Sequence, residues 1–248
     1  MLTFLRSLAF SAGMLVTVIA YGALVPLIAL LPFARRYAFT RHWARLNLRW
    51  LELTCGVRYR LVGQENLPQR PVVVLSKHQS TWETLVFQEI FPPLVWVMKR
   101  ELLWLPLFGW GLALGRPIAI DRGAGRRAME QMLSQGQQRL DDGLWVVIFP
   151  EGTRMPPGET RRYGISGAAL AHDANVPIVP VAHNAGDVWP RLSFVKRPGT
   201  VRFVIGPPIS AQGRQPRETN LVVQDWIESK MREISVAYGA PPAGGSDT

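Results

Sequence analysis

The chain has 248 residues and a formal net charge of +10, a length that suits one α/β domain with a full core plus an accessory segment. The charge is uneven, because residues 1–60 hold eight arginines and one glutamate while the remainder is nearly balanced. A basic segment beside apolar sequence favours an anionic membrane surface, and we expect no nucleic-acid partner, because zinc-ligand clusters, basic zippers and RNA-binding aromatic motifs are absent from the sequence. Cys55 is the single cysteine, so no intrachain disulfide can form.

The first predicted element is an apolar segment of 28 residues, from Ser7 to Ala34, that contains no charge. This length can cross a hydrocarbon layer of about 30 Å, and it is too long for a cleaved signal peptide. A straight span is favoured, while Pro26 leaves open a bent insertion from one side. If the segment spans, the arginines that follow it place the next domain in the cytoplasm.

The next segment, from Thr40 to Val57, predicts an amphipathic helix. Its apolar residues recur every three or four positions and form one stripe opposite three arginines: Trp43, Leu46, Trp50, Leu53 and Val57 against Arg41, Arg45 and Arg49. Two alternatives stay open, since the stripe can lie at the lipid interface or pack against the domain that follows. Either arrangement holds that domain close to a bilayer.

After residue 60, apolar runs alternate with helical stretches. Strands are predicted at 72–76, 94–98, 117–121, 144–149, 177–182 and 201–205, and helices near 82–90, 101–114, 125–141, 164–174 and 218–237. The alternation predicts an α/β fold with a largely parallel sheet flanked by helices, behind an N-terminal membrane-embedded helical segment. We divide the chain into an anchoring segment at 1–60, an α/β domain at 61–238 and a disordered tail at 239–248.

Two polar motifs follow predicted strands. His78 comes directly after the strand at 72–76, and Glu83 lies five positions later in the first turn of the next helix. A carboxylate that orients a neutral imidazole lets it take a proton from a hydroxyl, although this spacing alone also fits a surface histidine. Residues 149–154, Phe-Pro-Glu-Gly-Thr-Arg, follow the strand at 144–149 and supply an arginine for phosphate and oxygens for hydroxyls.

Two further blocks complete an ordered pattern: Gly-Arg-Pro-Ile-Ala-Ile-Asp-Arg at 115–122 and Val-Pro-Ile-Val-Pro-Val at 176–181. The four blocks resemble the PlsC-type 1-acylglycerol-3-phosphate acyltransferases, a family of lysophospholipid acyltransferases, over about residues 70 to 185. The family pattern is His-x4-Asp, Gly-x-x-x-Ile-Asp-Arg, Pro-Glu-Gly-Thr-Arg and Val-Pro-Ile-x-Pro. Glu83 departs from it by one methylene, and Arg161 and Arg162 stand where many relatives carry a lysine.

The resemblance implies transfer of a fatty acyl group from acyl-CoA or acyl carrier protein to the free hydroxyl of 1-acylglycerol-3-phosphate, giving phosphatidic acid without an acyl-enzyme. It implies no cofactor and no metal, and places the protein at a bacterial inner membrane with its catalytic domain on the cytoplasmic face. The acceptor can instead be a lyso-ornithine lipid, another lysophospholipid or glycerol 3-phosphate. A non-catalytic membrane-binding protein with this fold is the remaining alternative.

The resemblance also implies roles for individual residues. His78 is the expected base and Glu83 its orienting carboxylate. The acceptor phosphate is expected at Arg122 and Arg154, and the glycerol pocket is expected at Glu151, Gly152 and Thr153. The sequence does not identify the oxyanion donors, for which backbone amides near Gln79 and Ser80 are candidates. The apolar run at 105–111 can line an acyl-chain tunnel, dip into lipid or pack in the core, and His172 and His183 are expected to be structural or solvent-facing.

Overall fold

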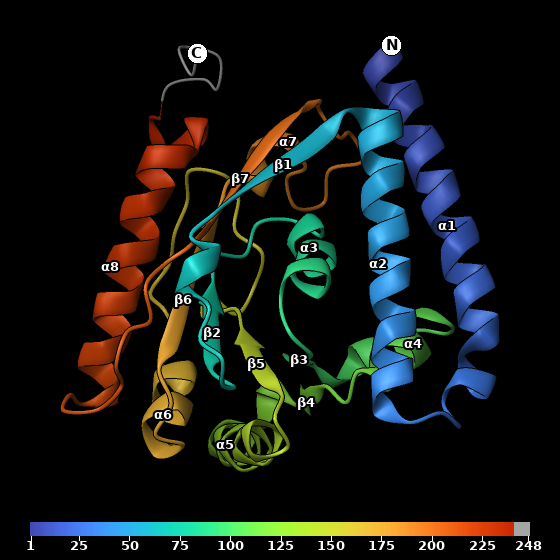
Figure 1. Ribbon diagram of the computed structural model, residues 1–248. Helices are drawn as coiled ribbons and strands as arrows, with labels where there is room; N and C mark the ends of the chain where they lie inside the picture. Colours follow the sequence, from blue (N-terminus) through green and yellow to red (C-terminus); the bar gives the residue numbers. More distant parts are fainter. Residues whose placement is uncertain (241–248) are drawn as a thin grey trace.

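The computed structural model describes residues 1–240, so the predicted tail lies outside the described residues from position 241 on. Two long helices, α1 (Leu2–Ile28) and α2 (Phe33–Cys55), begin the chain and lie side by side along one flank of the molecule (Figure 1). Helix α1 is long and apolar enough to cross a membrane. It ends before the predicted limit at residue 34, because the chain turns at Pro32, which precedes α2 and has no amide hydrogen to continue a helix.

A mixed seven-stranded sheet forms the centre, with the strand order β1-β7-β6-β2-β5-β3-β4. Its strands are β1 (Val57–Val62), β2 (Val73–Ser76), β3 (Leu94–Lys99), β4 (Ile118–Ile120), β5 (Trp145–Ile148), β6 (Ile178–His183) and β7 (Gly199–Ile205). Adjacent strands are parallel except for β6 and β7, which confirms the prediction of a largely parallel sheet.

Strand β1 is a strand that the sequence did not predict. It alternates arginines with apolar residues, most of its side chains are exposed, and it lies at the sheet edge beside β7. The register pairs Val57 with Gly199 and Val62 with Val204, so its partner is remote in the sequence. A half-exposed edge strand has only a weak hydrophobic pattern, which explains why the sequence did not predict it.

The helices after α2 are α3 (Trp82–Ile90), α4 (Phe108–Leu114), α5 (Arg126–Asp141), α6 (Ser166–Asp173), α7 (Ala185–Val188) and α8 (Pro216–Ile234). The helix predicted at 101–114 is instead broken into a 3-10 turn, Arg100–Trp104, and α4. Pro106 and the positive φ of 64° at Leu107 separate the two pieces, because neither conformation continues a helix.

Two apolar cores cover the two faces of the sheet. Successive residues of β2 alternate between them: Val74 packs with α1, α2 and α3, whereas Val73 and Leu75 pack with α5, α6 and α8. Phe10 of α1 and Leu51 of α2 are fully buried in the first core. The N-terminal helices therefore share a core with the sheet, while the division at residue 60 stays a prediction.

The stripe predicted on α2 lies toward α1 and is partly exposed, and its last member, Val57, belongs to β1. Leu46 and Leu53 are exposed, with Leu53 at 80%, whereas the indole nitrogens of Trp43 and Trp50 donate hydrogen bonds to α1. Ala44, Leu48 and Leu51 face the sheet instead. The stripe therefore contacts α1, a partner that the sequence did not predict, while another side of α2 packs on the domain.

Candidate active site

Three adjacent parallel strands bring the polar motifs to one edge of the sheet. Strand β2 lies between β5 and β6, and all three run in the same direction. Their carboxyl ends therefore meet at one edge. His78 and Glu151 lie on the loops that follow β2 and β5, and His183 is the last residue of β6. Active sites in open α/β sheets lie at such an edge.

His78 and Glu83 form a hydrogen-bonded pair. The Nδ1 atom of His78 lies 2.8 Å from Oε1 of Glu83, and the imidazole stacks on the ring of Phe149 with centroids 3.9 Å apart. Because an ionised carboxylate can only accept, the neutral imidazole carries its proton on Nδ1. Its Nε2 atom is then an acceptor, and it makes no hydrogen bond within residues 1–240. The side chain of His78 is 16% exposed, so a substrate can reach it.

Glu83 is fully buried, and its Oε1 atom also accepts the amide hydrogens of Gln79 and Ser80, each at 2.9 Å. Burial acts to raise its pKa, but the nearby imidazoles of His183 and His78, the His78 hydrogen bond and the Ser80 amide outweigh it, and the pKa is lowered. The carboxylate therefore stays ionised. The amides of Gln79 and Ser80, which the sequence left as candidate oxyanion donors, are both occupied by Glu83.

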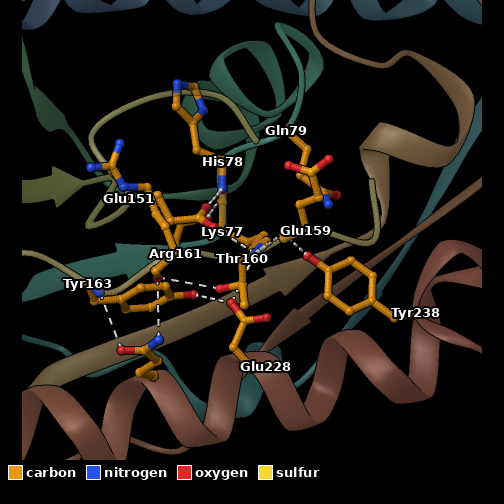
Figure 2. Close-up of polar contacts among 12 residues, drawn as sticks. Lys77, His78, Gln79, Glu151, Glu159, Thr160, Arg161, Tyr163, Glu228 and Tyr238 are labelled. Atoms are coloured by element: carbon orange, nitrogen blue, oxygen red, sulfur yellow. Dashed lines mark hydrogen bonds and ion pairs between the residues drawn. The ribbon is translucent and has the colours of Figure 1, made fainter. Parts of the chain in front are cut away.

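Glu151 turns away from the loop surface and into the protein. Its Oε1 atom lies 2.6 Å from Nζ of Lys77, and its Oε2 atom accepts the amide hydrogen of His78 at 3.0 Å (Figure 2). Gly152 follows in a tight turn with φ of 69°, a conformation that glycine adopts without strain. Burial raises the pKa of Glu151 to about 7, although Lys77 acts to lower it.

His183 fixes the same loop from the other neighbouring strand. It is fully buried, its Nε2 atom donates to the carbonyl oxygen of Lys77 at 2.8 Å, and its Nδ1 atom accepts the amide hydrogen of Ala185. Burial lowers its pKa, so the ring is neutral. It is structural, in agreement with one of the two predictions made for it.

The two arginines expected at the acceptor phosphate, Arg122 and Arg154, lie on loops that follow different strands, β4 and β5. Arg154 is half-buried, and its guanidinium donates to Oγ1 of Thr81 at 2.8 Å, next to the start of α3. The backbone of Arg122 lies after β4, three strands away from β2, and its side chain is outside the described part of the structure. Thr153 lies between Glu151 and Arg154 on the turn, half-buried. The structure thus brings Arg154, and not the backbone of Arg122, close to the loop of His78.

An apolar cavity of about 70 Å³ lies between α1, α2 and α4. Gly22, Trp43, Trp96 and Leu107 are among its lining residues. The ring of Trp96 stacks on Phe149 with centroids 5.7 Å apart, and Phe149 stacks on His78, so a column of rings connects this cavity to the imidazole.

Residues 1–240 contain no cluster of three or more His, Cys, Asp or Glu residues placed to hold a metal ion.

Comparison with known proteins identifies the family. The Acyltransferase family profile matches residues 58–184. The 1-acyl-sn-glycerol-3-phosphate acyltransferase of Pseudomonas aeruginosa is 44% identical over 236 residues, covering 93% of this chain and 92% of that protein. This chain belongs to the acyltransferase family. It is an O-acyltransferase related to the 1-acylglycerol-3-phosphate enzymes, as the four sequence blocks predicted.

More distant relatives extend the family likeness. The mouse 1-acyl-sn-glycerol-3-phosphate acyltransferase alpha is 30% identical over 82% of this chain and 72% of its own length. The crystal structure of the 1-acyl-sn-glycerophosphate acyltransferase PlsC from Thermotoga maritima superposes with a TM-score of 0.77, covering 92% of this chain and 94% of the other. At 23% identity, that structure shows a common fold for the two chains.

Proposed function

We propose that this enzyme transfers a fatty acyl group from acyl-CoA or acyl carrier protein to the free hydroxyl of 1-acylglycerol-3-phosphate, giving phosphatidic acid. The observation that carries the proposal is the His78–Glu83 pair at 2.8 Å, which leaves Nε2 of the imidazole as a proton acceptor at the accessible side of the loop. The name of the Pseudomonas relative supports this acceptor.

In the proposed reaction, Nε2 of His78 removes the hydroxyl proton of the acceptor as its oxygen attacks the thioester carbonyl. The ionised Glu83 stabilises the imidazolium through the hydrogen bond at Nδ1. The tetrahedral intermediate collapses, the carbon–sulfur bond breaks, and the imidazolium returns the proton to the thiolate. Because the serines beside the base, Ser76 and Ser80, are buried and hydrogen-bonded, direct transfer without an acyl-enzyme is favoured.

We propose Arg154 as a ligand of the acceptor phosphate, and Arg122 stays a proposed second ligand. Thr81 holds the guanidinium of Arg154 at the start of α3, beside the base, and a planar guanidinium can bind phosphate through paired donors. Gly152 and Thr153 remain the proposed walls of the glycerol pocket. Glu151 is less suited to that role, because protein donors occupy both of its carboxylate oxygens.

The acyl chain is proposed to enter the apolar cavity between α1, α2 and α4. The cavity is lined by apolar side chains, and Trp96 and Phe149 connect it to His78. Of the run at 105–111, Leu107 lines the cavity while Leu105 and Trp110 are exposed. The run therefore offers one residue to the proposed acyl-chain site and others to the proposed lipid contact.

The N-terminal apolar helix indicates membrane association. We propose an inner-membrane location with the active site on the cytoplasmic face. Helix α1 is held to the domain, because Oγ of Ser7 accepts the amide hydrogen of Lys196 at 2.9 Å and Phe10 packs edge-on against Trp189. This attachment favours a helix that inserts into the membrane from one side. It argues against a helix that crosses the membrane without contacting the domain.

Replacing two exposed apolar residues of α1, as in Leu15→Gln with Val16→Gln, should lower the fraction of protein that floats with phosphatidylglycerol vesicles. The matched control is Leu221→Gln, which lies on α8 at the opposite flank of the molecule (Figure 1). Equal flotation of both variants would refute a membrane-facing α1.

A competition assay tests the proposed reaction directly. Purified enzyme receives lysophosphatidic acid, lyso-ornithine lipid and lysophosphatidylglycerol, with labelled acyl-CoA or acyl carrier protein as donor. We expect transfer mainly to lysophosphatidic acid, a loss of about 10³-fold or more in His78→Ala, and little change in the control His172→Ala. Arg154→Ala should raise the KM for lysophosphatidic acid by about 10- to 100-fold.

Near-normal turnover in His78→Ala contradicts the mechanism. Preference for lyso-ornithine lipid, together with an unchanged KM in Arg154→Ala, leaves the base in place and overturns the assignment of acceptor and phosphate site.

A further inference from the structure

A buried ionic cluster lies directly beneath the proposed base. Lys77 is fully buried, and its ammonium donates to Oε1 of Glu151 at 2.6 Å, to Oε1 of Glu228 at 2.9 Å and to the carbonyl oxygen of Glu159 at 3.1 Å (Figure 2). An ammonium has three N–H donors, so all of them are used. Lys77 therefore has no donor left for a substrate.

The cluster is connected to His78 through Glu151. One carboxylate oxygen of Glu151 binds the side chain of Lys77, and the other accepts the backbone amide hydrogen of His78 at 3.0 Å. The carbonyl oxygen of His78 accepts the amide hydrogen of Met155 at 2.7 Å, and His183 holds the carbonyl oxygen of Lys77. Both peptide groups around the base are thus fixed, and a shift of Glu151 moves the backbone that carries the imidazole.

The cluster is connected to helix α8 through Glu228 and Tyr163. Three residues spaced four apart on α8 bind Tyr163: the Asn220 amide donates to its carbonyl oxygen, Gln224 accepts from its amide, and Glu228 accepts from its hydroxyl at 2.8 Å. Tyr238, just after α8, donates to the carbonyl oxygen of Glu159. One face of α8 therefore holds the loop that follows β5 through hydrogen bonds.

Stability alone is a poor reason for this arrangement. Removing a lysine and two carboxylates from water has a large desolvation cost, and apolar residues of similar volume often replace buried ion pairs without loss. What apolar residues cannot do is define one position for the His78 backbone through directional bonds. A displacement of about 1 Å in a reacting group can lower the rate of an enzyme by about 100-fold.

The geometry points to Lys77 and Glu228 as positioning residues for the acyl transfer: through Glu151 they fix the backbone of His78, so that helix α8 sets the direction of the imidazole. This inference rests on the proposed role of His78 as base. It also changes the role expected for Glu151, which then contacts the protein beneath the active site and not the glycerol of the acceptor.

Two variants and a matched control test the inference in the full-length enzyme. Lys77→Met removes the ammonium, and Glu228→Gln keeps the shape of the side chain while removing its charge. The control, Glu233→Gln, breaks an exposed pair with Lys230 on the same helix. We expect kcat to fall by about 10- to 100-fold in Lys77→Met and by about 3- to 10-fold in Glu228→Gln, with the KM for the acceptor changed less than about twofold. The control should match the parent enzyme.

A second readout does not depend on activity. The proton on Nδ1 of His78 faces a buried carboxylate and should give a low-field NMR signal, assigned by its loss in His78→Ala. We expect this signal to shift or broaden in Lys77→Met and Glu228→Gln and to stay in Glu233→Gln.

The two readouts separate this inference from the proposed function. A parent enzyme without acyl transfer contradicts the function, whereas the signal still tests the positioning. Folded variants with unchanged kcat and an unchanged signal would overturn the inference and leave the cluster a purely structural one. If Lys77→Met does not fold, Glu228→Gln decides by the same criteria.

Discussion

Two buried glutamates lie on either side of His78 and are stabilised differently. One oxygen of Glu83 accepts hydrogen bonds from Nδ1 of the imidazole and from two backbone amides, and the pKa of Glu83 is lowered. Glu151 accepts hydrogen bonds from one backbone amide and from Lys77, which also donates to Glu228, and the pKa of Glu151 is raised to about 7. Burial acts to raise both pKa values, and the neighbouring groups outweigh it only at Glu83.

The difference also separates two tasks. Glu83 acts on the imidazole itself, where its charge is needed when the ring becomes protonated. Glu151 acts on the peptide backbone of His78, where either a charged or a neutral oxygen can accept the amide hydrogen. The two carboxylates should therefore respond differently to the same substitution.

The largest effect is expected from Glu83→Gln. The amide is similar in size but cannot balance a positive imidazole, so kcat should fall by about 100-fold or more. Glu151→Gln keeps an acceptor for the His78 amide and should lower kcat by about 10-fold. Steady-state kinetics on both variants checks the comparison, and equal losses would show that the two carboxylates do not divide the work as proposed.

A smaller effect is expected in the pH dependence of stability. Because the native state holds a proton on Glu151 up to about pH 7, whereas the unfolded chain releases it near 4.5, the contribution of this group is full below pH 4.5 and is lost as pH rises to 7. Relative to Glu151→Gln, the parent protein should lose at most about 3 kcal/mol over this window. Denaturant unfolding at pH 5 and pH 7.5 measures the change, and parallel curves would contradict the raised pKa.

The smallest effect is expected from Glu83→Asp, which restores the usual family residue. The shorter side chain has to serve the imidazole and the amides of Gln79 and Ser80 from a helix placed for glutamate. We expect kcat to fall by about 10-fold, with the pH profile unchanged because the charge is kept. An aspartate variant as active as the parent enzyme would show that the helix adjusts freely.

The sequence predicted what is local and missed what is remote. The His78–Glu83 pair spans five positions at a strand-to-helix turn, so its pattern shows it. The Lys77–Glu228 pair joins residues 151 positions apart, and Glu228 has the spacing of an ordinary helix charge. The inward turn of Glu151 depends on that remote lysine, and no residue-by-residue pattern shows it. The break before α4, by contrast, is marked in the sequence by Pro106.

The place of β1 in the sheet affects how the protein is made. This strand follows α2, yet its hydrogen-bonding neighbour is β7, which begins at Gly199. At ribosomal speeds of about 5–20 residues per second, roughly 7 to 30 s separates the synthesis of the two strands. During that interval α1 can already contact lipid, while β1 has no β7 to pair with. Contact of α1 with a bilayer can thus precede the pairing of β1 with β7 and the completion of the fold.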